Sequence, residues 1–388
     1  MAPPPSALLR SRSVIIGLIA VVAVATGVAL AVATSGPRPT AVASPTAAST
    51  ATPTASPSPR RTPRPTPTPT PSATPEPVAV CPLDGLPVAD GLRIDATAMA
   101  VQIENHPDAR PARNLTHADM VVETTVEGDT TRFTGIFLCD RTEGMTGPVR
   151  SARYYSIDLW RDLGVLTVGF GASPGALQRF ERAGMPYPNG ITGAWPWYQR
   201  YGARGAPHNL YVDLEGMRGG LTANDALAAL AGRTGPLRAP FRFAEEPNLP
   251  PDDGRIASIG IRTTSYWRFG WTWDEASGTW LRSDAGVAIV DEATGRRIAA
   301  RTVVVQRVTE EIVTGDPDPG GNDRRLHHLV GSGNGTVFVD GRAYAARWSR
   351  PSDADGTTWT FANGEPVVLP PGQVWLEIIP THASVTAR

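Results

Sequence analysis

The chain has 388 residues, of which 41% are hydrophobic and 19% charged, and all of its basic residues are arginines. Residues 1–80 hold six arginines and one acid, so residues 81–388 hold 30 arginines against 36 acids, a net charge of −6. A net-acidic body without lysine argues against a nucleic-acid-binding protein and offers no broad positive surface for anionic lipid.

The first predicted element is a membrane anchor at Val14–Ala33, a run of 20 residues without charge. At about 1.5 Å per residue, a helix of this length spans the roughly 30 Å hydrocarbon layer. Arg10 and Arg12 precede the run, so residues 1–13 are expected in the cytoplasm and the rest outside. The sequence therefore predicts a single-pass protein of the cell membrane. A cleaved signal peptide is the alternative, because residues 31–33 (Ala-Val-Ala) have the form of a cleavage site.

Residues 34–80 consist almost entirely of Pro, Thr, Ser and Ala. Alternating prolines hold a backbone extended, and the small residues between them have no apolar area to bury, so we expect a disordered stalk. Cys81 opens the folded part, and Cys139 ends an apolar run. Outside the cytoplasm these two residues are candidates for a disulfide, although two isolated thiols are the alternative.

Apolar runs alternate with helix-like stretches over residues 81–240, which predicts a mixed α/β (α+β) N-terminal domain. We expect helices over 154–163, 174–184 and 221–230, the second of them capped by Ser173. The expected strands are 99–103, 120–126, 133–138, 165–170 and 209–213.

A Pro- and acid-rich segment, 238–251, separates this part from residues 252–388, where short strands and tight turns predict a smaller, mainly β C-terminal domain. The strongest strands are 303–308 and 374–379, and Asp340-Gly341 marks a hairpin turn. Trp267, Phe269, Trp271 and Trp273 alternate along one strand face. Such a stripe is more often the core side of a sheet, but an exposed stacking surface is the alternative.

Polar residues concentrate between Glu104 and Arg153. Glu104, Asn105 and His106 follow directly after a predicted strand, which is where sites are often built. On a strand Glu123 and Glu127 share one face, with their Cα atoms about 13 Å apart. The two catalytic carboxyl groups of a glycosidase lie roughly 5–9.5 Å apart, so this pair does not fit that mechanism. The simpler interpretation of these two acids is that they form salt bridges to nearby arginines.

The segment GPVRSAR, residues 147–153, suggests an anion site. Ser151 is placed to cap a helix beginning near Ala152, and a helix start offers free N–H groups. Arg150 and Arg153 flank this serine, so a carboxylate or phosphate could bind there. Internal pairing of both arginines with glutamates is the alternative.

Histidines offer weaker signals. His106 and His117 each begin an H-x-D pair, a pattern that can supply metal ligands, but no metal and no cofactor is predicted. His208, next to Asn209, is either a structural residue or a base. His327 and His328 point to opposite sides of a strand.

Several ordered motifs resemble the YerB-like lipoproteins of bacteria, a family of unknown function. In the first part these are CPLDGLPV, VQIENHPDARP, ADMVVETTVEGDTTRF, GPVRSARYYSIDL and PHNLYVD. In the second part they are WTWDEASGTWLR, RTVVVQ, GSGNGTVFVDGRAYAARW and PPGQVWLEIIP.

The resemblance implies two domains and a place on the outer face of the membrane. It points to a set of site candidates, namely Glu104, Asn105, Glu123, Glu127, Arg132, Arg150, Arg153, His208 and Asn209. One departure is that Cys81 follows Val80 rather than a small residue and lies far beyond the apolar segment. An anchor helix would therefore take the place of a lipidated cysteine.

The leading prediction is a membrane-tethered extracytoplasmic protein that binds an anionic envelope ligand, such as a cell-wall fragment, through these Glu, Arg and His residues and Ser151. One alternative is an envelope hydrolase that uses Glu104 or Glu127 with His208. Another is a structural interaction module with an aromatic surface. The sequence predicts no oligomeric state.

Overall fold

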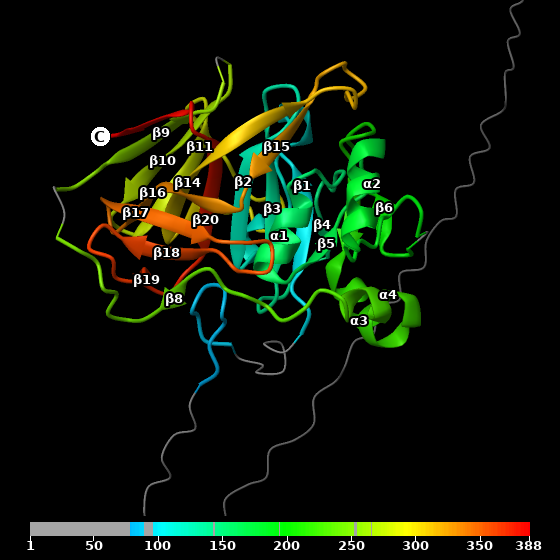
Figure 1. Cartoon of the computed structure of the whole chain (residues 1–388), viewed down its shortest axis with the longest axis horizontal. Coiled ribbons are helices and arrows are strands. Elements are labelled where there is room, and N and C mark those ends of the chain that lie inside the picture. The colour runs from blue at the N-terminus through cyan, green and yellow to red at the C-terminus, as the bar shows by residue number, and fades with distance from the viewer. Residues whose placement is uncertain (1–77, 89–95, 143, 194, 252–253, 265) are drawn as a thin grey trace, which may run out of the picture. The chain divides into compact units, whose positions relative to one another are not determined.

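The structure is a computed structural model that describes residues 78–88, 96–142, 144–193, 195–251, 254–264 and 266–388 (Figure 1). The predicted cytoplasmic segment 1–13, the anchor 14–33 and nearly all of the stalk 34–80 lie outside these residues. Among the described residues, none of the helices has the length and apolar character needed to cross a membrane.

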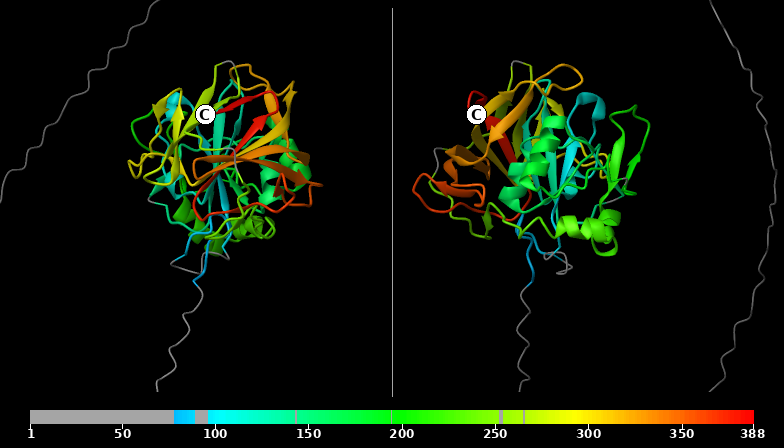
Figure 2. Two further views of the ribbon diagram at one scale, coloured as in Figure 1. Left: turned by 90° about the vertical axis from the view of Figure 1, so that its left-hand side faces the viewer. Right: turned by 45° about the vertical axis from the view of Figure 1, so that its right-hand side comes forward.

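A ten-stranded sheet unites the N-terminal and C-terminal parts of the chain (Figures 1 and 2). β20 lies between β14 and β2 and is parallel to both. In order across the sheet, the strands are β18 (Thr358–Phe361), β17 (Arg342–Arg350), β16 (Gly331–Val339), β14 (Thr302–Val313), β20 (Val374–Pro380), β2 (Met120–Thr125), β3 (Thr131–Phe137), β1 (Met99–Glu104) and β5 (Leu166–Val168), with β15 (Arg324–His328) paired to β14.

Alternating side chains along these strands build a separate apolar cluster on each face of the ten-stranded sheet. On β20, for example, Trp375 and Ile379 face one cluster, whereas Leu376 and Ile378 face the other. A second, smaller sheet packs on the Trp375 face. Its strands are β12 (Val287–Ala288), β11 (Thr279–Asp284), β10 (Arg268–Asp274), β9 (Ser258–Arg262) and β21 (Ser384–Ala387), with β13 (Ala299–Ala300) paired to β11.

The aromatic stripe of β10 forms the contact between the two sheets. Trp271 is 1% exposed, and its ring centroid lies 5.0 Å from that of Trp375. Phe269 is also buried, and Trp273 is half-buried against the same cluster. The interpretation of the stripe as the core side of a sheet is therefore correct, and the alternative of an exposed aromatic surface is wrong.

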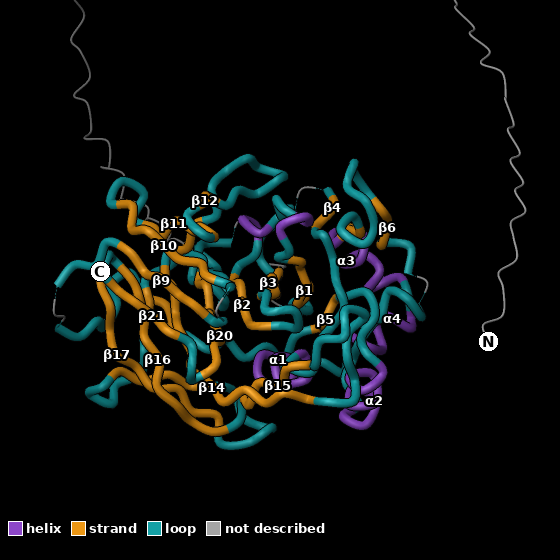
Figure 3. The backbone as a smooth tube through the Cα atoms, turned by 90° about the horizontal axis from the view of Figure 1, so that it is seen from above, coloured by secondary structure: helices purple, strands orange, loops and turns teal. Residues whose placement is uncertain are grey.

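The helices lie in the N-terminal part of the chain (Figure 3). α1 (Ser156–Leu163) packs on the Leu376 face of the ten-stranded sheet, and α2 (Pro174–Ala183) packs against α1. α3 (Leu214–Ala223) and α4 (Asp225–Ala231) join the opposite cluster near β5. The smaller elements are the three-stranded sheet β4 (Met145–Thr146), β7 (Leu210–Asp213) and β6 (Tyr198–Arg200), the pair β19 (Val368–Leu369) and β8 (Arg242–Phe243), and the 3-10 helices Pro107–Ala109 and Leu115–His117.

The N-terminal part differs in two ways from the expected α/β layer. Seven of its strands, β1 to β7, pair mostly in antiparallel fashion, and β1–β5 is the one parallel pair among them in the described residues. The helix expected over 221–230 is instead the end of α3 followed by α4. The two meet at Asn224, whose side chain accepts a hydrogen bond from the N–H of Leu227 and so starts a new helix.

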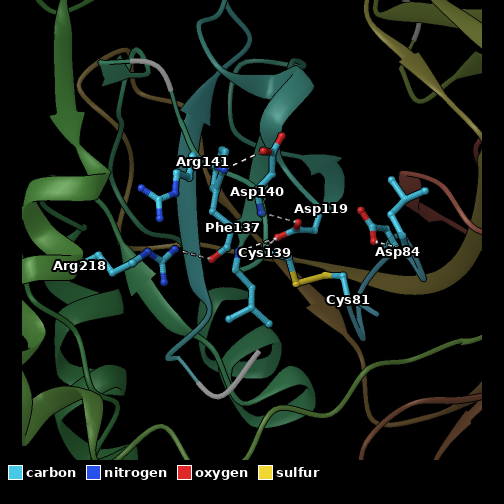
Figure 4. Close-up of a disulfide and its surroundings, with 10 residues drawn as sticks. Cys81, Asp84, Asp119, Phe137, Cys139, Asp140, Arg141 and Arg218 are labelled. Atoms are coloured by element: carbon cyan, nitrogen blue, oxygen red, sulfur yellow. Dashed lines mark hydrogen bonds between the residues drawn. A yellow bond between two sulfur atoms is a disulfide. The ribbon is translucent and has the colours of Figure 1, made fainter. Parts of the chain in front are cut away.

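Cys81 and Cys139 form a disulfide with their Cα atoms 5.9 Å apart, and it closes a loop of 58 residues (Figure 4). Cys139 lies just beyond β3, where the carboxylate of Asp119 accepts hydrogen bonds from three consecutive backbone N–H groups, including that of Cys139. The bridge ties the first described segment to the end of a central strand.

Candidate functional site

The segment 147–152 runs beside the end of β1. The N–H of Glu104 donates to the carbonyl of Pro148 at 2.8 Å, and the N–H of Arg150 donates to the carbonyl of Gln102 at 2.8 Å. On its other side, the N–H of Ala152 donates to the carbonyl of Gly171 at 2.9 Å. These bonds place Arg150 next to the last residue of β1.

Because those bonds hold the segment extended, the prediction that Ser151 caps a helix is wrong. α1 begins at Ser156, and the residue before it, Tyr155, makes no side-chain capping bond. The hydroxyl of Ser156 instead accepts a hydrogen bond from the N–H of Arg153 at 3.1 Å. Any anion site here would therefore rest on arginine side chains and not on a helix N-terminus.

Glu104 lies between two cationic or potentially cationic groups. Its Oε1 atom is 3.1 Å from Nε of Arg150, and its Oε2 atom is 3.2 Å from Nδ1 of His208. The Glu104 side chain is only 4% exposed, whereas that of Arg150 is 30% exposed. The structure thus brings together three of the predicted site residues, of which Arg150 is the most exposed and His208, at 22%, is also partly exposed.

Glu127 forms a second ion-pair group, just beyond β2. Its carboxylate is 2.7 Å from Nε of Arg153 and 3.4 Å from Nη1 of Arg324, a residue of the C-terminal part. Burial alone would raise the pKa of Glu127, but Arg153, Arg324 and Arg132 together lower it below its ordinary value. The interpretation of Glu127 as a salt-bridge partner agrees with this geometry.

Arg132 pairs in register with Glu104 across β1 and β3, and its side chain is buried. Its Nη1 atom donates to the carbonyl of Ser151 at 3.2 Å, and Nη1 of Arg153 donates to the same oxygen at 3.1 Å. Within the described part of the chain, its guanidinium has no carboxylate at ion-pairing distance, and its buried Nε has no acceptor. Burial, together with the charge of Arg153, lowers the pKa of Arg132 to about 9.

Glu123 and Asn105 lie apart from this arginine cluster, which we define as Arg132, Arg150 and Arg153. Glu123 is fully buried between the sheets, where both of its oxygens accept hydrogen bonds from Nη2 of Arg282 at 2.9 Å. Asn105 donates to the hydroxyl of Thr131 at 2.8 Å, and that hydroxyl donates to Glu123. Neither residue can contact a ligand from solvent without opening the core, so the structure does not support their prediction as ligand-binding residues.

Two further arginines belong to the surroundings of the site, although sequence reasoning did not single them out. Arg324 contacts Glu127, and Arg200 of β6 donates to Oδ1 of Asn209 at 2.7 Å. The charge of Arg200 also acts on Arg150, whose pKa is lowered first by burial. Arg324 carries no local signal, because its partner Glu127 lies far away in the sequence, whereas Arg200 is nine residues from Asn209 across the β6–β7 pair.

A separate open groove of about 690 Å³ lies on the outward face of the small sheet. Gly270 lies in this groove at a position that admits no side chain, because a Cβ atom there would lie 2.3 Å from the carbonyl oxygen of Ile259 on the neighbouring strand. Three arginines, Arg262, Arg268 and Arg388, line it together with serines and threonines. It contains neither histidine nor an acidic side chain among its described lining residues, so it offers charge without a catalytic group.

Both parts of the chain match one protein family. The family described as "Protein of unknown function (DUF3048)" matches with its N-terminal domain at residues 83–227 and its C-terminal domain at residues 259–376. The chain belongs to this family. The match confirms the predicted two-domain architecture, although one sheet runs through both parts.

Two matches to Bacillus subtilis proteins agree with this assignment. The chain is 28% identical over 300 residues to "Putative lipoprotein YerB" of strain 168, and the match covers 77% of this chain and 86% of the relative. The crystal structure of YerB protein from Bacillus subtilis matches with a TM-score of 0.65 at 25% identity, over 79% of this chain and 99% of that chain. The predicted resemblance to the YerB-like family is therefore confirmed.

Proposed function

We propose that this protein binds an anionic envelope ligand, such as a cell-wall fragment, at the arginine cluster. The observation that carries the proposal is Arg132, a buried guanidinium without a carboxylate partner among the described residues. Burying a charge that has no carboxylate at ion-pairing distance is costly. An anion that binds beside Arg132 would compensate its charge.

The neighbouring charges support an anion rather than a cation at this place. The guanidinium groups of Arg132 and Arg153 both donate to the carbonyl of Ser151, and in the described part of the chain Glu104 and Glu127 are the carboxylates that pair with the cluster. Planar guanidinium groups bind carboxylates and phosphates through two parallel hydrogen bonds. Arg150, which is the most exposed of the three, would make the first contact.

The proposed location is the outer side of the cell membrane. The apolar run 14–33 supports a tether, and the disulfide between Cys81 and Cys139 suits an oxidising compartment. The Bacillus subtilis relative is named "Putative lipoprotein YerB", which is consistent with attachment to a membrane. Protease treatment of intact cells should remove residues 81–388. If these residues are digested only after lysis, the proposed location is wrong.

An envelope hydrolase that uses Glu104 or Glu127 with His208 is the weaker proposal. A general acid needs a raised pKa, whereas the pKa of Glu127 is lowered by its arginine neighbours. Both oxygens of Glu104 already face a cation or an imidazole. The geometry therefore favours binding over acid–base catalysis.

The test is calorimetric titration of the full-length protein, purified in detergent, with soluble cell-wall fragments and with inorganic phosphate. Hydrogen bonds to charged groups contribute about 1.5–3 kcal/mol, so Arg150→Gln should weaken binding at least about tenfold. Arg347→Gln is the matched control. Arg347 is exposed on β17, six strands from β1, or about 29 Å at the usual strand spacing.

Two results would contradict the proposal. One is binding that Arg150→Gln leaves unchanged. The other is binding that survives in Arg150→Gln but is lost in Arg268→Gln, which would move the anion site to the groove of the small sheet. Circular dichroism of each variant checks that the fold is intact.

A further inference from the structure

Two histidines and an aspartate meet at the surface beside Glu104. One ligand atom from each of His106, Asp108 and His208 lies within 4.8 Å of the other two. The two imidazole rings stack with centroids 5.2 Å apart and planes inclined by 19°. His106 and Asp108 come from the turn after β1, and His208 comes from the segment before β7, so the fold and not the local sequence brings them together.

Two potential ligand atoms of this group lie side by side in one turn of the chain. Nδ1 of His106 accepts a hydrogen bond from the N–H of Asp108 at 3.3 Å, so this nitrogen presents a lone pair. The Oδ2 atom of Asp108 lies 3.6 Å from the same nitrogen. The lone pair of this nitrogen is directed at the N–H of Asp108, and a metal ion bound here would replace that long hydrogen bond, with the carboxylate beside it as a second ligand. In a tetrahedral zinc site, ligand atoms are about 3.3 Å apart, which is close to this separation.

Glu104 supplies an independent observation. Its side chain is 4% exposed, and its Oε2 atom is directed at Nδ1 of His208, 3.2 Å away. Neither atom has a hydrogen-bond partner of acceptable geometry in the described structure. Metal-binding histidines usually hold their second ring nitrogen against a carboxylate, which fixes the ring and directs the other nitrogen at the metal. A slight turn of the His208 ring would complete that contact and leave Nε2 free.

We propose that His106, Asp108 and His208 bind a divalent first-row transition metal ion, with Glu104 positioning His208. Two imidazoles and one carboxylate suit Zn²⁺ and its neighbours rather than Ca²⁺, which prefers oxygen ligands alone. Three protein ligands leave a coordination position open to solvent. The exposed side chains of His106 and Asp108 can adjust their rotamers to close the remaining distance.

The experiment titrates the full-length protein, purified metal-free, with Zn²⁺ in competition with a chromophoric chelator, and with Co²⁺ followed by absorption. We expect one ion per chain. His106→Ala and His208→Ala should each weaken Zn²⁺ binding at least about 100-fold, and Glu104→Gln about 10- to 100-fold. Asp108→Asn, on an exposed side chain, should weaken binding without disturbing the fold.

The matched control is His328→Ala. His328 is 47% exposed and lies 3.2 Å from the carboxylate of Glu311. Like His208 it is a histidine beside a glutamate, but it lies on β15 and not at the proposed metal site. It should leave binding unchanged. The proposal is overturned if one equivalent of Zn²⁺ does not bind, if His106→Ala and Asp108→Asn bind it as tightly as the natural chain, or if Ca²⁺ competes equally well. Asp108→Asn leaves Arg150 and the rest of the arginine cluster unchanged. Loss of Zn²⁺ binding in this variant therefore tests the metal site separately from the proposed anion site.

Discussion

Replacing Arg282 by methionine should destabilise the protein strongly, because this arginine neutralises the acids buried between the two sheets. Its side chain is 0% exposed and contacts Glu123 and Asp284 at 2.9 and 2.6 Å. Arg110 also pairs with Asp284. A third acid, Glu377, accepts a hydrogen bond from Nε1 of Trp271 at 3.0 Å. Burial and the charge of Glu123 raise the pKa of Glu377 well above its ordinary range, so Glu377 holds a proton.

With Glu377 neutral, the charges of the network balance. The carboxylates of Glu123 and Asp284 face the guanidinium groups of two arginines, Arg282 and Arg110. Removing Arg282 leaves the carboxylate of Glu123 buried without a cation, which should cost about 3–5 kcal/mol. Urea unfolding of the full-length protein, followed by tryptophan fluorescence, measures this change because Trp271 and Trp375 lie beside the network.

Glu377→Gln is the control. Glutamine keeps an acceptor for Trp271 and replaces a group that is already neutral, so we expect a change below about 1 kcal/mol at pH 7. The double variant Glu123→Leu/Arg282→Met should recover most of the loss, because neither charge is then left unpaired. A loss below about 1 kcal/mol in Arg282→Met alone would refute this account of the network.

Three further variants test other contacts. Burial raises the pKa of Asp84 to about 7, so its contribution to stability is present below about pH 4 and is lost as the pH rises through 7. Asp84→Asn should therefore stabilise by roughly 4 kcal/mol at pH 8 but not at pH 4 in thermal unfolding, and equal effects at both would contradict this. Replacing Cys81 and Cys139 by serine should cost about 4 kcal/mol in urea unfolding, and a reductant should then have no further effect. Thr357→Val removes a 2.7 Å hydrogen bond to the buried carboxylate of Asp162 and should cost about 1–3 kcal/mol, whereas Thr358→Val, at an exposed position, should cost less.

The sequence correctly predicted structural elements whose conformation is determined by residues next to one another in the chain. Ser173 followed by Pro174 marks the start of α2, and the serine side chain does accept a hydrogen bond from the N–H of Ala176. Asp340 and Gly341 adopt φ values of 53° and 66°, as the hairpin turn between β16 and β17 requires. In both cases neighbouring residues decide the conformation.

The features that sequence reasoning missed depend on contacts between distant residues. Arg282 and Glu123 are 159 positions apart, and nothing near Glu123 shows that its partner comes from the small sheet. One feature of the sequence does indicate a buried acid. Arg282 lies between Trp280 and Asp284 on the inward face of β11, and an arginine at an inward position implies a buried acid.

The GPVRSAR segment shows why a correct set of residues can come with an incorrect mechanism. Pairing of Arg150 and Arg153 with glutamates was the alternative interpretation of this segment, and the structure shows that pairing, with Glu104 and Glu127. The helix start that should have drawn an anion lies at Ser156 instead, because β1 and Gly171 take up the N–H groups of Arg150 and Ala152. An anion at this segment would therefore bind to guanidinium groups and not to backbone N–H groups.

Glu104 connects the two proposals, because one carboxylate serves both neighbours. Its Oε1 atom faces Arg150, and its Oε2 atom faces His208. A variant of Glu104 should disturb anion and metal binding together, so it cannot tell them apart. Arg150→Gln and Asp108→Asn can, since each changes one neighbourhood and leaves the carboxylate in place. If both variants lost both activities, the metal and the anion would occupy one composite site, with the anion completing the coordination of the metal.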